Sequence, residues 1–438
     1  MAKRHVIVGG GTGGLNAILT IREHERDASE ITLVSAERPY SRMVLPYYLG
    51  RSIAESHVFT LTPPRLAQLQ IRCHIGRRAA KLEASTNQLA LDDGTTLEYD
   101  DLLIATGSSA VKAAVPGAES PGVHSFWTLE QARSLVAQIH EGSHVVMVGA
   151  GFIGFTILDA ILRLRANLTV VEIAPQILPR MIDRAGAEMV AQWLTRHGVA
   201  VRTGATLTAV EEADGRKRLR FREQEDLVAD VVIMATGIRT NLEWLKGTGM
   251  RVNRGILVDD HLRSSIPNIY AAGDVAEGND LVTGQPAVHA IEPTAMEHGR
   301  VAGANMAGLD VAYRGSLLMN IVEVCHLDIA SFGAWDDPTA EAFAVLKPER
   351  WAYRKLLWRA DRVVGGIILG MANDIWTTND VGMLKGLVQS GGGLGAWKEH
   401  LRRNPFDLKP AFIASGTTAR LLPETILGRP AVPAEPVH

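Results

Sequence analysis

Cysteine is scarce in this chain, where only Cys73 and Cys325 occur among 438 residues. Each stands alone in the sequence. A Cys-x-x-Cys redox pair, an iron–sulfur cluster held by four thiolates and a zinc knuckle are therefore excluded within the chain. We expect both cysteines to be buried, because an isolated cysteine usually behaves as a small hydrophobic residue. No metal site is predicted.

Long apolar runs and an excess of basic charge are also missing. No run approaches the roughly 20 apolar residues that a membrane-spanning helix needs. "MAKR" passes directly into a strand-like "HVIV", without the apolar core and cleavage site of a signal peptide. The formal net charge is −3, and the sequence has no basic stripe of the kind that binds nucleic acid. We therefore expect a cytoplasmic protein with neither a membrane nor a nucleic acid as its partner.

Glycine is plentiful, with 42 residues, and the first of two glycine-rich loops lies near the N-terminus. "HVIV" predicts a buried parallel strand, and Gly9, Gly11 and Gly14 follow it with the spacing G-x-G-x-x-G. An amphipathic helix comes next, and then a second strand that ends near Glu37. Such glycines let a pyrophosphate approach the N-terminus of the helix, and the carboxylate can accept hydrogen bonds from a ribose. The pattern predicts a dinucleotide site.

A second loop repeats this arrangement at 145–154, "VVMVGAGFIG". Gly149, Gly151 and Gly154 form the turn, and the next strand ends at Glu172. No arginine or histidine follows closely that could bind a 2′-phosphate, and the Glu172 carboxylate would repel one. The site is therefore predicted to prefer NADH to NADPH. In the alternative interpretation, Glu172 only ends a strand.

Three further segments complete the pattern. Two apolar strands, at 97–110 and 229–241, each end in Ala-Thr-Gly. The stretch "NIYAAGD" then places Asp274 just after a glycine, where its carboxylate can hold a ribityl hydroxyl. Pro293 suits the first position of the helix that follows. The N-terminal amides of that helix would point at an electron-rich group such as a reduced flavin.

The order of these five elements resembles the two-dinucleotide-binding-domain flavoprotein superfamily, the FAD- and pyridine-nucleotide-dependent reductases. The resemblance implies an α/β fold with two Rossmann-like domains and a C-terminal α/β interface domain. The FAD-binding domain would be discontinuous. The implied divisions are an FAD-binding domain at 1–115 and 250–308, an NAD(H)-binding domain at 116–249, the interface domain at 309–405 and an extended tail at 406–438.

The same resemblance assigns residues to each cofactor. FAD would be lined by Gly9, Gly11, Gly13, Gly14, Ser35, Glu37, Arg42, Pro46, Ala80, Thr106, Gly107, Gly273, Asp274, Thr294 and Ala295. NADH would be lined by Gly149, Gly151, Phe152, Ile153, Gly154, Glu172 and Gly237, with Phe152 and Thr156 near the nicotinamide. No catalytic acid or base is assigned, since hydride transfer is cofactor chemistry that needs mainly orientation.

The electron acceptor is the open question. In the stretch "YSRMVLPYYLGR", coenzyme A disulfide reductases and water-forming NADH oxidases carry a reactive cysteine where Met43 stands. A thioether forms neither a thiolate nor a mixed disulfide, so a thiol mechanism is excluded. The chain instead resembles rubredoxin and ferredoxin reductases, the FAD part of the nitrite reductase large subunit, and the FAD subunits of tungsten aldehyde oxidoreductase complexes. Tyr47 and Thr156 depart from the lysine and glutamate that many relatives carry there.

This resemblance implies that FAD exchanges electrons with NADH and with a separate iron–sulfur protein or subunit, in a direction that the sequence does not decide. A homodimer or a hetero-oligomeric complex is expected. Two alternatives stay open: an NADH oxidase that uses oxygen, and an NADH-responsive redox-sensing or assembly flavoprotein.

Several residues outside the motifs are also of interest. Cys325 and His326 are interpreted as strand residues. His289 and His298 flank the predicted flavin-facing helix, either as a proton relay or as ordinary hydrogen-bonding groups. Five of the eight tryptophans lie between residues 335 and 397, where they would form a core or a partner interface.

Overall fold

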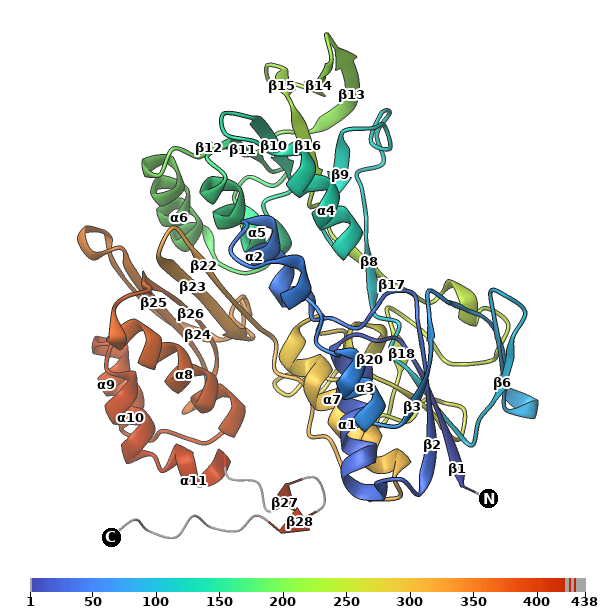
Figure 1. Ribbon diagram of the computed structural model, residues 1–438. Coiled ribbons are helices and arrows are strands. Elements are labelled where there is room, and N and C mark those ends of the chain that lie inside the picture. The colour runs from blue at the N-terminus through green and yellow to red at the C-terminus, as the bar shows by residue number, and fades with distance from the viewer. Residues whose placement is uncertain (1, 422–424, 427–428, 431–438) are drawn as a thin grey trace.

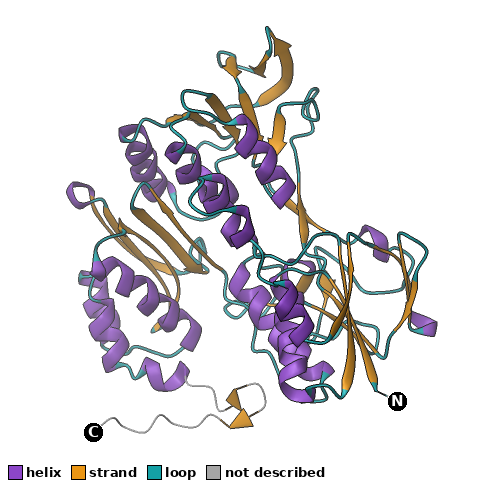
Figure 2. Ribbon diagram, viewed as in Figure 1, coloured by secondary structure: helices purple, strands orange, loops and turns teal. Residues whose placement is uncertain are grey.

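The computed structural model describes residues 2–421, 425–426 and 429–430 (Figure 1). Within them, helices pack against three five-stranded sheets, and several smaller sheets extend from these units (Figure 2). Two of the large sheets are parallel, and the third is antiparallel. The α/β class predicted from the sequence, with two Rossmann-like sheets and a C-terminal α/β layer, is confirmed.

The first sheet has the strand order β19-β7-β1-β2-β3, and all of its strands are parallel. Strand β1 is central because its apolar side chains are buried on both faces. Helices α1 and α7 pack against each other on one face of the sheet (Figure 1). The elements are β1 (Lys3–Val8), α1 (Thr12–Glu25), β2 (Ser29–Ser35), β3 (Ile71–Ile75), β7 (Asp101–Ile104), β19 (Ile269–Ala271) and α7 (Glu292–Met306).

The second sheet repeats this topology in the order β12-β11-β10-β16-β9, again with parallel strands. Its central strand β10 leads into the second glycine loop. The elements are β9 (Val123–Ser125), α4 (Leu129–Gln138), β10 (His144–Val148), α5 (Phe152–Arg163), β11 (Asn167–Val171), α6 (Arg184–Arg196), β12 (Ala200–Arg202) and β16 (Val231–Met234).

Smaller elements extend or join these two units. The chain crosses between the units twice, and the crossings pair as the antiparallel strands β8 (Ser108–Ala110) and β17 (Ile238–Thr240). Two short helices, α2 (Leu45–Leu49) and α3 (Pro63–Gln68), follow β2. The small sheets contain β4 (Ala79–Glu83), β5 (Gln88–Leu91), β6 (Thr96–Glu98), β13 (Leu207–Ala213), β14 (Arg216–Phe221), β15 (Leu227–Ala229), β18 (Ile256–Leu257), β20 (Ala276–Asn279) and β21 (Pro286–Ala287).

The third sheet is antiparallel, in the order β22-β23-β26-β25-β24. One face packs against α5 and α6 of the second unit, and the other face is covered by α8 to α10 (Figure 1). The elements are β22 (Met319–Val324), β23 (Leu327–Gly333), β24 (Glu341–Lys347), β25 (Ala352–Arg359), β26 (Arg362–Met371), α8 (Ile375–Ser390), α9 (Trp397–Arg403), α10 (Leu408–Ala414) and α11 (Thr417–Leu421). After them, β27 (Thr425–Ile426) and β28 (Arg429–Pro430) pair as a separate two-stranded sheet.

Side chains from both units hold the third sheet on the second. The Trp193 indole in α6 donates to the Cys325 carbonyl at 3.2 Å and contacts the Trp351 ring edge-on. The Tyr353 hydroxyl donates to the Asp183 carboxylate at 2.7 Å. One continuous hydrophobic core therefore runs from the second sheet into the third.

The structure corrects three expectations from the sequence. Neither cysteine is buried as expected: Cys73 is exposed because β3 is the edge strand of the first sheet, and Cys325 is half-buried. Cys325 and His326 are not strand residues but form the tight turn between β22 and β23, with φ of 48° and 64°. The expected extended tail from residue 406 begins with helices α10 and α11, which pack on α8. Its later part lies mostly outside the described residues.

Most tryptophans between 335 and 397 serve the core. Trp335 and Trp358 are buried, and Trp351 and Trp397 are half-buried. Trp376, the second residue of α8, is 64% exposed. Among the described residues, no helix is long and apolar enough to cross a membrane.

Candidate functional site

A cavity of about 850 Å³ lies where the first and second units meet. It opens at the carboxyl ends of strands in the first sheet, which is where open α/β sheets bind their ligands. Its volume falls in the upper part of the range usual for ligand sites, roughly 300–1,000 Å³. It is therefore large enough for an extended cofactor.

The first glycine loop forms one wall of this cavity. Gly9 has φ of +116°, and a Cβ there would lie 2.0 Å from the Ala105 carbonyl oxygen. Gly11 caps α1 without a side-chain hydrogen bond, so the first amides of the helix are left for a ligand. Gly14 does not line the cavity; a Cβ on it would lie 2.0 Å from the Gly9 carbonyl oxygen. The loop can close this tightly only with glycine at positions 9 and 14.

Glu37 lies at the cavity wall just after β2, and Tyr40 holds its carboxylate. The Tyr40 hydroxyl donates to Glu37 Oε2 at 2.9 Å and accepts from the Leu129 amide of α4 at 2.9 Å. Burial, together with the neighbouring Glu37 charge, raises the pKa of Tyr40. The phenol therefore stays protonated and keeps donating. Tyr40 stands two residues before Arg42 but was not among the residues assigned to FAD from the sequence.

Asp274 follows β19 and reaches the same cavity. Its Oδ2 accepts from the Ser108 hydroxyl at 2.6 Å and lies 3.8 Å from a guanidinium nitrogen of Arg42. The Arg42 guanidinium lies over the Trp127 ring, 4.7 Å from its centroid. The Trp127 indole in turn donates to the Ser108 carbonyl at 2.6 Å. These contacts fix the Asp274 carboxylate, and no sequence pattern indicated Ser108 or Trp127.

The N-terminus of α7 carries a further carboxylate that sequence reasoning missed. Glu292 is the first residue of α7 and lines the cavity. Its Oε1 accepts from the Thr12 hydroxyl of α1 at 2.9 Å and from the Ser41 hydroxyl at 2.5 Å. An acidic residue at a predicted helix start was visible in the sequence.

The second glycine loop brings α5 to the same cavity. Phe152, Ile153 and Thr156 all line it. The Thr156 hydroxyl donates to the Ile153 carbonyl at 2.7 Å, so it is satisfied within its own helix. Gly151 caps α5 without a side-chain hydrogen bond, as Gly11 caps α1. The two nucleotide motifs therefore converge on one space.

Glu172 is buried at the end of β11. Its Oε2 accepts from the Ala150 amide at 2.7 Å, and its Oε1 accepts from the Ala174 amide at 2.9 Å. The carboxylate thus ties the second glycine loop to the end of β11. Each oxygen keeps further lone-pair capacity, so a ribose hydroxyl could still bind there.

Most residues assigned to FAD from the sequence line the cavity, and fewer of those assigned to NADH do. The lining includes Gly9, Gly11, Gly13, Ser35, Glu37, Arg42, Pro46, Thr106, Gly107, Gly273, Asp274, Ala295, Phe152, Ile153 and Thr156. Outside the lining lie Gly14, Ala80, Thr294, Gly149, Gly151, Gly154, Glu172 and Gly237; Ala79 lines the cavity in place of Ala80. Met319 and Ile321 of β22 also line it, which the sequence did not indicate.

His298 lies within α7 and His289 lies just before it, and neither residue is part of the cavity lining. The His289 ring lies 3.0 Å from Asp280, and the His298 ring lies 3.2 Å from the Ser316 hydroxyl. Burial lowers the pKa of His298 to about 3, so this ring stays neutral.

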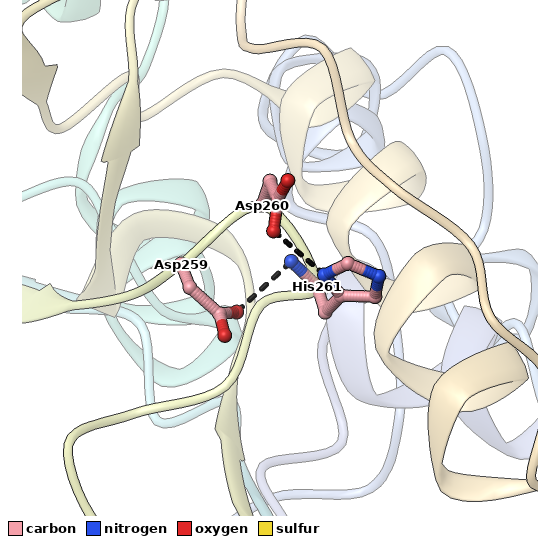
Figure 3. Close-up of side chains that lie close together, drawn as sticks. All are labelled: Asp259, Asp260 and His261. Carbon is pink, nitrogen blue, oxygen red and sulfur yellow. Dashed lines mark hydrogen bonds and ion pairs between the residues drawn. The ribbon is translucent and has the colours of Figure 1, made fainter.

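Asp259, Asp260 and His261 gather their polar atoms in one small cluster (Figure 3). Asp260 accepts from one ring nitrogen of His261 at 2.6 Å, and Asp310 lies 2.8 Å from the other. Asp259 accepts from the His261 backbone amide. Both ring nitrogens are therefore engaged with carboxylates.

The donor set fits FAD together with NAD(H). Two helix N-termini that lack side-chain caps face the junction of the units, and the Glu37 and Asp274 carboxylates are held in place for hydroxyl groups. The chain belongs to the pyridine nucleotide-disulphide oxidoreductase family, whose model matches residues 3–299. It is an NAD(H)-dependent flavoprotein oxidoreductase that uses FAD and NAD(H).

Among its relatives is the NADH-dependent phenylglyoxylate dehydrogenase subunit epsilon of Aromatoleum evansii, 30% identical over 83% of this chain and 87% of that protein. The assimilatory nitrate reductase electron transfer subunit of Bacillus subtilis is 26% identical over 85% of this chain. This chain spans only 48% of that relative's length. Rubredoxin and ferredoxin reductases and a nitrite reductase are further relatives, as the resemblance implied.

A solved structure with the same fold is the NAD-dependent persulfide reductase from A. fulgidus. It is 26% identical, with a TM-score of 0.85, over 95% of this chain and 83% of that one. The similarity extends beyond the family model into the third sheet.

Proposed function

We propose that this chain is the FAD-binding subunit of an electron-transfer system, linking NAD(H) to an iron–sulfur protein or subunit. The observation that carries the proposal is the single cavity at which Phe152 and Thr156 of the second unit meet Asp274 and Gly11 of the first. Bound FAD would take a hydride from NADH and release its two electrons singly. The chain's own residues bind and orient the two cofactors.

The sulfur chemistry of the chain supports a separate acceptor. Met43 lines the cavity where thiol-dependent relatives carry a cysteine. Cys73 lies on the edge strand β3, and Cys325 lies in the turn after β22; neither belongs to the cavity lining. Burial, with a contribution from Asp159, raises the pKa of Cys325 to about 12, so its thiol is unreactive. Electrons must therefore leave by another route.

The relatives support the same assignment. Two of them are named as a subunit of an NADH-dependent dehydrogenase and as an electron transfer subunit. We propose by analogy that this chain works within a hetero-oligomeric complex, such as an aldehyde oxidoreductase, in the cytoplasm. The direction of electron transfer depends on the partner, because the same arrangement of FAD and NAD(H) allows hydride transfer in either direction.

We further propose that the cofactor assignments follow the two units. Residues 1–115 and 250–308 would bind FAD, residues 116–249 would bind NAD(H), and residues 309–405 would form the interface domain. Gly14 and Gly149, which do not line the cavity, would act indirectly by shaping their loops. Glu172 would hold the second loop and accept a hydrogen bond from the ribose of NADH, so that the site prefers NADH to NADPH.

Co-purification from the native host tests the partner. A tagged chain is expected to retain a protein that contains iron and acid-labile sulfide, and to deliver electrons from NADH to it. A chain that purifies alone, and that transfers electrons only to oxygen, would contradict the proposal and favour an NADH oxidase.

A further inference from the structure

Glu292 places a carboxylate at the N-terminus of α7, next to the residues assigned to the flavin. The first turn of a helix carries a partial positive charge that stabilises a nearby anion. The N-terminus of α7 lines the cavity beside Gly273 and Asp274, where the flavin is assigned. In this chain that helix begins with a carboxylate, and Pro293 after it provides no amide. The side chain therefore opposes the favourable field of the helix.

The carboxylate is held firmly at this place. Oε1 accepts from both Thr12 and Ser41, which belong to α1 and to the segment before α2. The helix itself cannot retreat, because it packs closely on α1. A Cβ on Gly299 would lie 2.2 Å from the Gly13 carbonyl oxygen, and one on Gly303 would lie 2.7 Å from the Ala17 carbonyl oxygen.

The charge also lacks a cation to neutralise it. Among the described residues, no lysine, arginine or histidine forms an ion pair with Glu292. By contrast, the Asp274 carboxylate in the same cavity has Arg42 at 3.8 Å. The two hydroxyls supply only hydrogen-bond dipoles. Within the described part of the chain, the negative charge of Glu292 therefore remains without a counter-charge at the N-terminus of α7.

We propose that Glu292 sets the redox potential of the bound flavin. Its carboxylate disfavours the negative charge that the flavin gains on reduction, so the reduced form is a stronger electron donor. This inference rests on the proposed function, because a low potential is useful for exchange with a low-potential iron–sulfur partner. Glu292 acts on the flavin only through its negative charge and takes no part in hydride transfer.

The test is the midpoint potential of the FAD-loaded chain, measured anaerobically against reference dyes with no NADH present. Glu292→Gln keeps the side-chain size and an acceptor for Thr12 and Ser41 but removes the charge. The ratio of reduced to oxidised flavin at a fixed potential is expected to rise about tenfold, as for one partly solvated charge nearby. For a two-electron couple, this corresponds to a potential about 30 mV higher.

Two controls separate this effect from general damage. Glu292→Asp keeps the charge and is expected to stay near the wild-type potential. Glu297→Gln removes one charge from the same helix at an exposed position outside the cavity lining, and is expected to leave the potential unchanged. If Glu297→Gln shifts the potential as much as Glu292→Gln does, the effect is one of net charge and the inference is wrong.

A further variant covers the case in which Glu292→Gln fails to retain FAD. Ser41→Ala removes one hydroxyl donor and leaves the carboxylate less compensated, so the potential should fall. A potential unchanged or raised in Ser41→Ala, or unchanged in Glu292→Gln, overturns the inference. The potential is measured with dyes and without NADH, so the result does not depend on NADH-driven electron transfer. An unchanged potential would therefore overturn the role of Glu292 and leave the proposed function standing.

Discussion

At the scale of single residues, the site depends on carboxylates that other groups hold in place. Tyr40 holds Glu37, Ser108 holds Asp274, and two backbone amides hold Glu172. Charge-assisted hydrogen bonds of this kind fix geometry more firmly than neutral ones. The cofactor hydroxyls would therefore meet preformed acceptors.

Glu172 should decide the choice of nicotinamide cofactor. The wild-type chain is expected to use NADH at least about tenfold more efficiently than NADPH, because the carboxylate repels a 2′-phosphate. Glu172→Ala also leaves the amides of Ala150 and Ala174 without their acceptor, so kcat/KM for NADH should fall about tenfold or more. Steady-state kinetics with both cofactors provide the check. Equal efficiency in the wild type would refute the assignment.

The cysteines should be dispensable. A Cys73→Ser, Cys325→Ser double variant is expected to keep NADH-driven dye reduction within about twofold of the wild type, because neither thiol lines the cavity. Treatment of the wild type with a thiol-alkylating reagent should likewise have little effect. A large loss of activity in both experiments would show that the electrons pass through sulfur after all.

Glycine spacing predicted the loops well because it reports a local steric need. Gly9 must adopt φ of +116° against the Ala105 carbonyl, and only glycine can do so. Contacts between distant segments were not predictable in this way. Glu292 meets Thr12 and Ser41 only after α7 packs on α1, and no local pattern encodes that meeting. Cys73 was misjudged because strand order, which makes β3 an edge, is also a long-range property.

At the scale of elements, α8 is fixed to the third sheet by a buried ion pair. The Arg354 guanidinium of β25 lies 2.9 Å from Asp380 of α8 and also donates to the Leu369 carbonyl at 2.7 Å. Both side chains are almost fully buried. Such a pair stabilises little in itself, but breaking it leaves a buried charge without a partner.

Asp380→Ala should therefore lower the free energy of unfolding by about 3–5 kcal/mol. Glu188→Ala is the matched control, because it breaks the exposed Arg184–Glu188 pair of α6 and should cost no more than about 0.5 kcal/mol. Urea unfolding followed by tryptophan fluorescence measures both. Similar losses of unfolding free energy in the two variants would mean that the buried Arg354–Asp380 pair matters no more to stability than an exposed pair.

The His261 cluster links the segment after β18 to the segment after α7. Burial disfavours the charged ring, but the hydrogen bonds to Asp260 and Asp310 outweigh it and raise the pKa of His261. The protonated ring therefore stabilises the folded chain. This stabilisation is complete when the pH is below the pKa of histidine in the unfolded chain, near 6.5, and it is lost as the pH rises through the higher pKa of His261 in the folded chain. Because the aspartates are exposed, the benefit should stay below about 1 kcal/mol.

His261→Gln should remove this pH dependence. Between pH 6 and pH 9, the melting temperature of the wild type is expected to fall more than that of the variant, with the difference concentrated above pH 6.5. Thermal melts of both proteins at several pH values, all at the same ionic strength, compare their melting temperatures. Parallel profiles for the two proteins would show that the ring does not titrate with folding.

At the scale of the whole molecule, the third sheet joins the second unit through one core and also reaches the cavity. Trp193 and Tyr353 fix the sheet to α6 and its N-terminus, while Met319 and Ile321 place β22 at the cavity wall. The first and second units meet at the cavity and are joined by β8 and β17. Residues of the first unit, the second unit and the third sheet therefore line one cavity.

The most direct test of the central claim is anaerobic. The purified FAD-loaded chain is reduced with one equivalent of NADH and then mixed with ferricyanide, benzyl viologen or oxygenated buffer, while flavin absorbance is followed. We predict rapid bleaching by NADH, then much faster reoxidation by the one-electron acceptors than by oxygen. Reoxidation that is fastest with oxygen would contradict the account and indicate an NADH oxidase. Flavin that stays reduced with every acceptor would indicate an NADH-responsive sensor instead.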